Sequence, residues 1–325
     1  MGKFHVPRRG SLQFWPRKRA AKIMPSVNWK GFASKKFDSK NGMLGFVGYK
    51  VGMASAVVKD STLNSMTKGK SIVIPVTILE CPAMKIFSVR FYRDGKVATE
   101  VVSQNVDKEM RRKVKLPKAA KSLDEFAGKL NEYEDIRIIV YSSVRKAKLK
   151  KTPEIIEIAL IGDIKQKFDT AKGLLDKEIN VNDVFGKGQM LDIHAVTKGK
   201  GLQGPVKRFG ITFKQHKSEK GVKRPGSLGP WHPARVTFRT PMAGQLGFFT
   251  RVQYNNKVLE IGKELSELKG NKVRSEWQNY GFVNSPYCVM LGSVSGSQKR
   301  PVVLTAAIRP KKVTTKQALE VVEIL

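Results

Sequence analysis

Two long stretches of this sequence combine a large excess of positive charge with almost no periodic pattern of apolar residues. Residues 1–50 contain 12 Lys or Arg and one Asp, and residues 198–251 contain 12 Lys or Arg and a single Glu. Glycine and proline recur in residues 1–41 and in residues 198–251, so neither segment sustains the period expected of a strand or an amphipathic helix. The hydrophobic core must therefore come from the rest of the chain, and these two stretches are predicted to be extensions.

The charge of the whole chain predicts a polyanionic partner. The net charge is +34 over 325 residues, and self-repulsion at that charge opposes a compact state that stands alone in water. With 41% hydrophobic residues the chain is nevertheless too apolar to be a disordered basic tail. Nucleic acid is the favoured partner, and an anionic membrane is the weaker alternative.

Several features argue against membrane insertion and secretion. The uncharged stretch 280–298 contains Asn, Ser, Gly and Pro residues and does not predict a spanning helix. The N-terminus has no apolar run of the kind found in secretory signals. Cys81 and Cys288 lie far apart in the sequence without metal-type spacing, so they are expected to be buried thiols of a reduced, cytoplasmic protein.

The remaining chain predicts a mainly β fold with an α+β insertion. Asp94-Gly95 lies between two alternating segments and is a strong hairpin signal. Strands are expected at 71–80, 85–93, 96–103, 136–141, 154–160, 189–197, 250–261, 288–294 and 301–309, and residues 42–58 suggest a pair of strands. Helices are expected at 108–115, 122–133, 163–175 and 315–324. The helical segments cluster between residues 105 and 176, which suggests that roughly residues 81–180 are the insertion.

The motif Gly199-Lys200-Gly201-Leu202-Gln203-Gly204 matches GxGxxG after a predicted strand. A dinucleotide site also needs a helix to follow and a βαβ unit around it. Pro205 and Gly210 follow instead, and no further apolar strand comes. A basic, glycine-rich loop that contacts RNA explains these residues better, and no cofactor is predicted.

The other residue types used in catalysis show no catalytic pattern. His5, His194, His216 and His232 have neither metal-ligand nor nucleophile-elbow spacing. His194 lies within a predicted strand and is expected to be structural or to face a partner. The basic stretches contain no paired carboxylates for acid–base chemistry. The sequence therefore predicts no enzyme, no metal site and no small-molecule substrate.

Aromatic residues are interleaved with the basic ones, as in surfaces that stack on unpaired bases. In the N-terminal stretch they include Trp15, Trp29 and Phe32. Trp231 lies in a bend rich in Gly and Pro, residues 226–233. Two interpretations stay open for Trp231: a core residue that fixes the loop to the body, or a residue at the loop tip that wedges among RNA bases.

Five segments, in order, resemble a known family. They are RRGSL (8–12), PRKRA (16–20), KGKGLQGPVKR (198–208), GSLGPWHPARV (226–236) and MAGQLG (242–247). The resemblance is to the ribosomal protein L3 family of the large ribosomal subunit, in its archaeal form, and it covers essentially the whole chain. It implies a β-barrel of the type found in translation proteins, with long extensions that penetrate RNA.

The resemblance also implies a function. A member of this family is a structural constituent of the large ribosomal subunit that binds large-subunit ribosomal RNA and neighbouring ribosomal proteins. It supports early subunit assembly and extends its internal loop toward the peptidyl transferase centre. Trp231 then matches the aromatic residue near the tip of that loop, and Gln245 matches a glutamine that is methylated in bacterial relatives.

From the residues and the resemblance together we predict an organisation and a set of RNA contacts. The expected parts are a basic N-terminal extension (1–40), a β-barrel body (41–80 and 181–310), the α+β insertion (81–180), a basic loop within the barrel (198–251) and a C-terminal helix (311–325). RNA contacts are expected at Arg8, Arg9, Trp15, Arg17, Lys18, Arg19, Lys198, Lys200, Lys207, Arg208, Lys223, Arg224, Trp231, His232, Arg235, Gln245 and Arg251. Both extensions are expected to be largely disordered without RNA.

Two rival functions remain. An RNA-modifying enzyme with basic clamps would need a cofactor pocket, and only the GxGxxG motif hints at one. A basic module for DNA or membranes would show little preference for ribosomal RNA over duplex DNA. The charge-balanced segment 151–192 lacks the cation excess of an RNA-binding face, so we expect it to face solvent or neighbouring proteins.

Overall fold

The computed structural model describes residues 9–32, 37, 39–117, 121–270 and 276–325. The chain forms two compact units. Unit 1 consists of residues 1–22 and 196–250, and unit 2 consists of residues 23–195 and 251–325. Within the described part of the chain, no helix is both long and apolar enough to cross a membrane.

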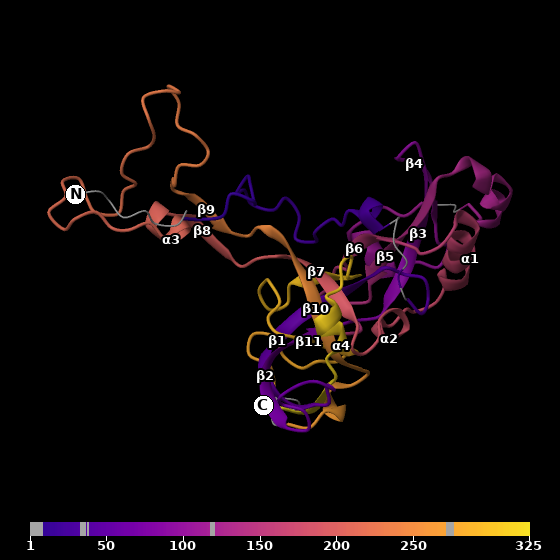
Figure 1. Ribbon diagram of the computed structural model, residues 1–325. Helices are drawn as coiled ribbons and strands as arrows, with labels where there is room; N and C mark the ends of the chain where they lie inside the picture. Colours follow the sequence, from indigo (N-terminus) through magenta and orange to yellow (C-terminus); the bar gives the residue numbers. More distant parts are fainter. Residues whose placement is uncertain (1–8, 33–36, 38, 118–120, 271–275) are drawn as a thin grey trace. The chain divides into compact units, whose positions relative to one another are not determined.

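The predicted mainly β character is confirmed, because strands outnumber helices and form several sheets (Figure 1). The strands are β1 (Gly45–Asp60), β2 (Ser71–Glu80), β3 (Met84–Arg93), β4 (Lys96–Val102), β5 (Asp135–Ser142), β6 (Ile155–Ala159), β7 (Met190–Val196), β8 (Gly199–Gln203), β9 (Gly244–Gly247), β10 (Thr250–Gly262), β11 (Tyr287–Leu291), β12 (Pro301–Ala306) and β13 (Leu319–Ile324). The α-helices are α1 (Ile164–Leu174), α2 (Val181–Val184), α3 (Pro205–Phe209) and α4 (Lys312–Lys316). The 3-10 helices are η1 (Trp29–Phe32), η2 (Lys108–Arg112), η3 (Asp124–Glu132) and η4 (Leu265–Glu267).

The larger sheet of unit 2 has the strand order β12-β7-β10-β11-β2-β1-β13. Strand β12 also pairs with β1, so six of the seven strands form a closed circuit of hydrogen-bonded neighbours. Strand β1 takes part in three pairings, because its first half lies against β12 and its second half against β13 while β2 runs along the other side. The expected type of barrel and the domain boundaries stay predictions.

Residues 42–58 were expected to form two strands, and this expectation is wrong. Residues 45–58 belong to the single long strand β1, which has a register shift between Lys50 and Gly52 in its pairing with β2. The glycines that suggested a turn are instead places of close packing. A Cβ at Gly52 would lie 2.8 Å from the ring of Trp277, and a Cβ at Gly45 would lie 3.0 Å from the ring of Trp29.

A separate sheet with the order β4-β3-β5-β6 lies in the segment expected to be the insertion. The predicted hairpin between β3 and β4 is confirmed. Asp94 and Gly95 have φ angles of 51° and 69°, as a two-residue type I′ turn requires. Aromatic side chains of η3 and α1 cover this sheet, with Phe126 5.4 Å and Phe168 6.5 Å from the ring centroid of Phe91.

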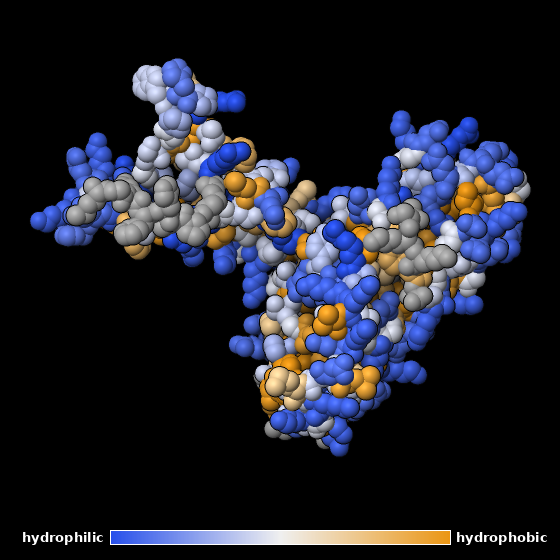
Figure 2. All heavy atoms as spheres, in the orientation of Figure 1, coloured by the Kyte–Doolittle hydropathy of each residue, from blue (hydrophilic) through white to orange (hydrophobic). Residues whose placement is uncertain are grey.

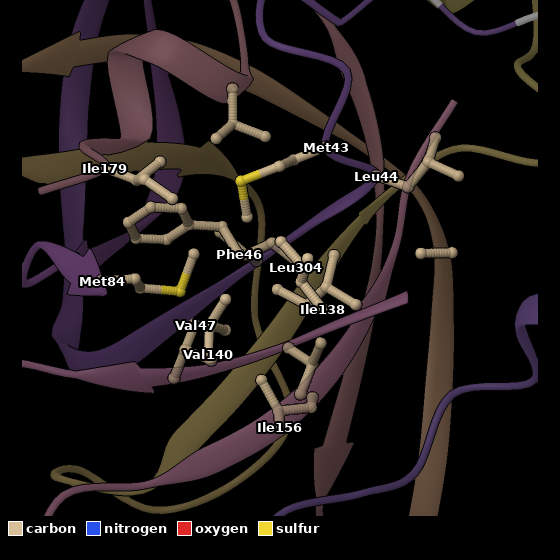
Figure 3. Packing of buried hydrophobic residues seen from close by; sticks show 14 of the residues in the cluster. Met43, Leu44, Phe46, Val47, Met84, Ile138, Val140, Ile156, Ile179 and Leu304 are labelled. Atoms are coloured by element: carbon tan, nitrogen blue, oxygen red, sulfur yellow. The ribbon is translucent and has the colours of Figure 1, made fainter. Parts of the chain in front are cut away.

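The main hydrophobic core of unit 2 joins the two sheets. Figure 3 shows side chains of β1, including Phe46 and Val47, packed with Ile138, Val140 and Ile156 of the smaller sheet. Phe46 and Val47 have no solvent exposure. Because β1 is covered on both faces, its first half is a continuously buried run rather than an alternating one.

The helix expected at residues 311–325 is wrong. Only Lys312–Lys316 are helical, and Leu319–Ile324 form strand β13, which pairs antiparallel with the end of β1. Leu319 and Val321 pack on a second cluster of buried apolar residues, separate from the main core, and Ile324 is fully buried within it. Pairing with the free edge of β1, which buries alternate side chains, therefore stabilises a strand here more than the helical spacing of apolar residues stabilises a helix. The two helices expected at 108–115 and 122–133 exist as the shorter 3-10 helices η2 and η3.

Candidate nucleic-acid interface

The base of unit 1 is a short antiparallel ladder between β8 and β9. Gly199 pairs with Gly247, and the backbone N–H of Phe248 donates to the carbonyl oxygen of Lys198 at 3.2 Å. Gly247 has φ of 69°, and a Cβ there would lie 2.0 Å from that same carbonyl oxygen. Glycine is therefore required where the returning chain passes closest to β8.

The residues after the GxGxxG motif differ from expectation in one respect. A helix does follow it: α3 begins at Pro205 and ends at Gly210, which has φ of 68°. Proline is suited to the first helical position, so Pro205 starts this turn rather than preventing it. However, β8 pairs antiparallel with β9, which is not the parallel βαβ arrangement of a dinucleotide site.

The N-terminal segment packs on this base. The N–H of Ala20 donates to the carbonyl oxygen of Phe248 at 2.9 Å. Arg17 lies between two aromatic rings, with its guanidinium carbon 4.2 Å from the ring centroid of Phe209 and 5.3 Å from that of Trp15. The ring of Trp15 in turn packs against that of Phe238 in a T-shaped arrangement, with 5.2 Å between the ring centroids. Residues distant in sequence thus form one chain of cation–π and aromatic contacts.

Arg208 fixes the return of the long loop. Its Nε donates to the carbonyl oxygen of Gln245 at 2.9 Å, and its Nη1 donates to that of Met242 at 3.0 Å. A Cβ at Gly244 would lie 3.0 Å from this guanidinium, so the glycine gives it room. Burial lowers the pKa of Arg208, yet an arginine remains a cation in proteins.

The loop between α3 and β9 extends from this base (Figure 1). Trp231 is 88% exposed, next to the exposed His232 and Arg235. The interpretation of Trp231 as a core residue is therefore wrong, and its ring is open to a partner. The loop has some order of its own, since the Thr240 hydroxyl donates to the carbonyl oxygen of Leu228 at 2.9 Å.

Unit 1 is strongly cationic. Its two segments contain 18 Lys or Arg and only Glu219, so its net charge of +17 is half of the +34 carried by the whole chain. Hydrophilic side chains cover most of its visible face, with isolated hydrophobic spots among them (Figure 2). The exposed members of the predicted contact set are Arg9, Lys18, Arg19, Lys198, Lys200, Lys207, Lys223, Arg224, Trp231, His232 and Arg235.

Five predicted contact residues have a different position. Trp15, Arg17, Arg208 and Gln245 are half-buried at the base of unit 1. The amide nitrogen of Gln245 donates to the carbonyl oxygens of Leu246 and Gly247, at 3.3 and 3.0 Å. Arg251 is half-buried at the start of the second segment of unit 2, and burial lowers its pKa. Arg8 lies outside the described residues.

The aromatic residues of the N-terminal extension do not act as one group. Trp29 and Phe32 were expected to stack on bases, but they are 5% and 3% exposed within the core of unit 2. The indole N–H of Trp29 donates to the carbonyl oxygen of Glu157 at 2.9 Å. The extension thus divides after Lys22 into a part that belongs to unit 1 and a part that anchors to unit 2.

The structure agrees with the expected role of His194 within a strand. It is buried in β7, with its Nε2 3.3 Å from the hydroxyl of Thr305, and burial lowers its pKa. No group of three or more potential metal ligands occurs among the described residues.

Sequence reasoning missed the aromatic partners at the base of unit 1. Phe209 and Phe238 lie within the predicted basic loop, but their respective partners, Arg17 and Trp15, are more than 190 residues away. Arg239, whose guanidinium carbon lies 5.8 Å from the ring centroid of Phe238, was missed as well. An aromatic residue next to an arginine was the available signal, and one sequence alone does not show which distant ring completes the contact.

Comparisons with known proteins agree on one family. The family model described as ribosomal protein L3 matches residues 1–324. A protein of Archaeoglobus fulgidus named large ribosomal subunit protein uL3 is 38% identical over 319 residues, which cover 95% of this chain and 94% of that protein. The protein of the same name in Methanocaldococcus jannaschii is 39% identical over 319 residues, which cover 94% of this chain and 92% of that protein.

Proposed function

The chain belongs to the ribosomal protein L3 family, and we propose on this premise that it is a structural constituent of the large ribosomal subunit in the cytoplasm. In this proposal unit 1 binds large-subunit ribosomal RNA, supports early subunit assembly and carries Trp231 toward the peptidyl transferase centre. The chain has no catalytic chemistry of its own, and its other partners are neighbouring ribosomal proteins.

The observation that supports this proposal best is the composition of a folded unit. Unit 1 has 18 cationic side chains and one carboxylate, and its loop projects an exposed tryptophan. In a protein that acted alone, such an excess of like charge would oppose folding. When phosphates replace the missing carboxylates, the same cations release counterions from the RNA and stabilise the complex.

The two kinds of side chain have separate roles. The exposed Lys and Arg neutralise phosphates and position the protein without reading sequence. The half-buried Arg17 and Arg208 hold the N-terminal segment and the loop together, so that the exposed cations reach the RNA as one surface. Trp231 offers an aromatic face on which an unpaired base stacks.

The test is binding of the full chain to purified large-subunit ribosomal RNA over a range of salt concentrations. A variant with Lys223→Gln, Arg224→Gln and Arg235→Gln lacks three exposed cations of unit 1. We expect its slope of log affinity against log salt to fall by about one for each phosphate that the variant no longer neutralises. The control is Lys68→Gln with Lys70→Gln, two exposed cations beside the β1–β2 turn of unit 2.

Two outcomes would reject the proposal. Equal affinity of the wild-type chain for ribosomal RNA and duplex DNA at moderate salt would favour a general basic module. Failure of the chain to sediment with the large subunit, combined with binding of S-adenosylmethionine or a nucleotide, would favour an RNA-modifying enzyme.

A further inference from the structure

A large hollow in the described part of unit 2 lies away from the residues discussed so far. It has a volume of about 1120 Å³, and its lining residues come from three parts of the chain: Phe37, Ser39 and Lys40, then residues between 184 and 190, then residues between 306 and 315. Pockets that hold small molecules usually measure ~300–1,000 Å³ and enclose most of their ligand. This hollow, which we call the β12 groove, is larger than such a pocket and is open to solvent, as expected for a site that holds a polymer chain.

Small and apolar residues make up much of the lining of the β12 groove. Gly186 and Gly188 lie at its edge, and a Cβ added at either residue would meet no atom within 4 Å. Ala306 and Ala307 form another part of the lining. A chain lying in the groove would therefore approach the protein backbone closely at several points.

The charge around the β12 groove is mainly positive. Lys40 and Lys187 line it, and Arg309, Lys311 and Lys312 lie next to its lining residues in the sequence, where Asp38 is the one acidic residue of these segments. The neighbouring carboxylate of Glu260 is already paired with Lys187, whose Nζ lies 2.5 Å from it. Arg309, Lys311 and Lys312 are exposed. An anionic polymer complements this groove, whereas a neutral or basic peptide does not.

We infer that the β12 groove is a second RNA-binding site, which holds an irregular strand of ribosomal RNA against unit 2. This inference rests on the proposed function and extends it to a surface that the sequence did not indicate. The cations along 309–312 contact the phosphates, and the glycines at 186 and 188 leave room for the backbone of the strand. An acidic segment of a neighbouring protein is the competing occupant.

Gly186 permits a steric test without strain. It does not have a positive φ, and its added side chain would enter open space. In the full chain, Gly186→Trp should fill the groove and weaken binding to purified large-subunit ribosomal RNA by about 10-fold. The matched control is Gly173→Trp on α1, another glycine with open space around its Cβ, which should bind as the wild type does.

Arg309→Gln with Lys311→Gln and Lys312→Gln should lower the salt slope by about one for each phosphate left without its cation.

Crosslinking identifies the occupant. The two native cysteines are both buried, so a short photoreactive group attached at Gly186→Cys labels the groove selectively. In assembled large subunits we expect an adduct with ribosomal RNA. An adduct with a protein, or no adduct, overturns the inference, as does unchanged RNA affinity of Gly186→Trp. If that variant binds normally while the unit 1 variant is impaired, the groove inference fails and the proposed function stands. If the wild-type chain shows no preference for ribosomal RNA, the proposed function fails as well.

Discussion

The guanidinium carbon of Arg17 lies 4.2 Å from the ring centroid of Phe209. The two residues are far apart in the sequence, since Arg208, which precedes Phe209, is 191 positions from Arg17. Arg17 also donates from Nη1 to the carbonyl oxygen of Arg208 at 3.5 Å and from Nη2 to that of Ser11 at 3.2 Å. One cation thus joins the N-terminal segment to the start of the long loop. Residues 1–22 of the expected N-terminal extension and the basic loop form one unit, held by contacts within the protein.

Arg17→Ala should release the N-terminal segment from the loop. The variant lacks a partly desolvated cation–π interaction and two hydrogen bonds, for a local cost of about 1–2 kcal/mol. Hydrogen exchange at the N–H of Ala20, which donates to the carbonyl oxygen of Phe248, should accelerate about 10-fold.

The control for this experiment is Lys18→Ala, which removes an exposed neighbouring cation and should leave that exchange rate unchanged. Rapid exchange at Ala20 in the free wild-type protein would contradict the role of Arg17. It would instead support the sequence-based expectation that both extensions are disordered without RNA.

Gly247→Ala should disrupt the base of unit 1. A Cβ at this position would lie 2.0 Å from the carbonyl oxygen of Lys198, and the positive φ of 69° adds backbone strain. We expect a local cost of about 2 kcal/mol or more. Loss of hydrogen-exchange protection at Phe248, whose N–H donates to Lys198, measures it.

Gly204→Ala is the matched control, because that glycine has open space around its Cβ and no positive φ. The Gly247 account would be wrong if both alanine variants showed the same exchange at Phe248.

Elements determined by local chemistry could be predicted from the sequence. The Asp94-Gly95 hairpin and most strands were found because their turn residues and alternating patterns act over short distances along the chain. The two wrong predictions concern segments whose structure depends on contacts with distant parts of the chain. Residues 319–324 became a strand because the edge of β1 is available to them, and 45–58 remained one strand because neighbours pack against its glycines.

The candidate site shows the same limit. Charge composition located the basic loop, because charge is counted along the chain, whereas the exposure of Trp231 came from the structure. The contacts of Trp15 with Phe238 and of Arg17 with Phe209 depend on the path of the fold. The burial of Trp29 and the β12 groove likewise depend on segments that only the fold brings together.

Trp231→Ala should separate function from stability. Because the side chain is 88% exposed, the free energy of unfolding should change by no more than about 0.5 kcal/mol. If a base stacks on the ring, affinity for large-subunit ribosomal RNA should fall by ~1–3 kcal/mol, and subunits carrying the variant should be slower in peptidyl transfer.

Trp231→Phe is the control for Trp231→Ala, because it keeps an aromatic face and should retain most of the affinity. Equal RNA binding by the alanine variant and the wild type would remove base stacking from the proposed function.

Glu80 should make the stability of unit 2 depend on pH. Its carboxylate is fully buried and accepts hydrogen bonds from the Tyr280 hydroxyl and from the N–H groups of Asn284 and Ser285, at 2.8 and 2.9 Å for the latter two. Burial raises its pKa above the ordinary value of 4.5, an effect that these hydrogen bonds only partly offset. Over the interval between the two pKa values the unfolded chain has released this proton while the folded chain retains it. The free energy of unfolding should therefore fall as pH rises from about 4.5 to the folded pKa, and then level off.

Glu80→Gln isolates this contribution. The amide oxygen can accept from Asn284 and Ser285, and the amide nitrogen can donate to the Tyr280 oxygen, but the side chain no longer titrates. Urea unfolding followed by far-UV circular dichroism gives the free energies for both proteins from about pH 4 upward. Because the other titrating groups are shared, the stability of wild type minus that of the variant should decrease with rising pH and then become constant. A difference that does not vary with pH would show that the pKa of Glu80 is the same in the folded and unfolded chain.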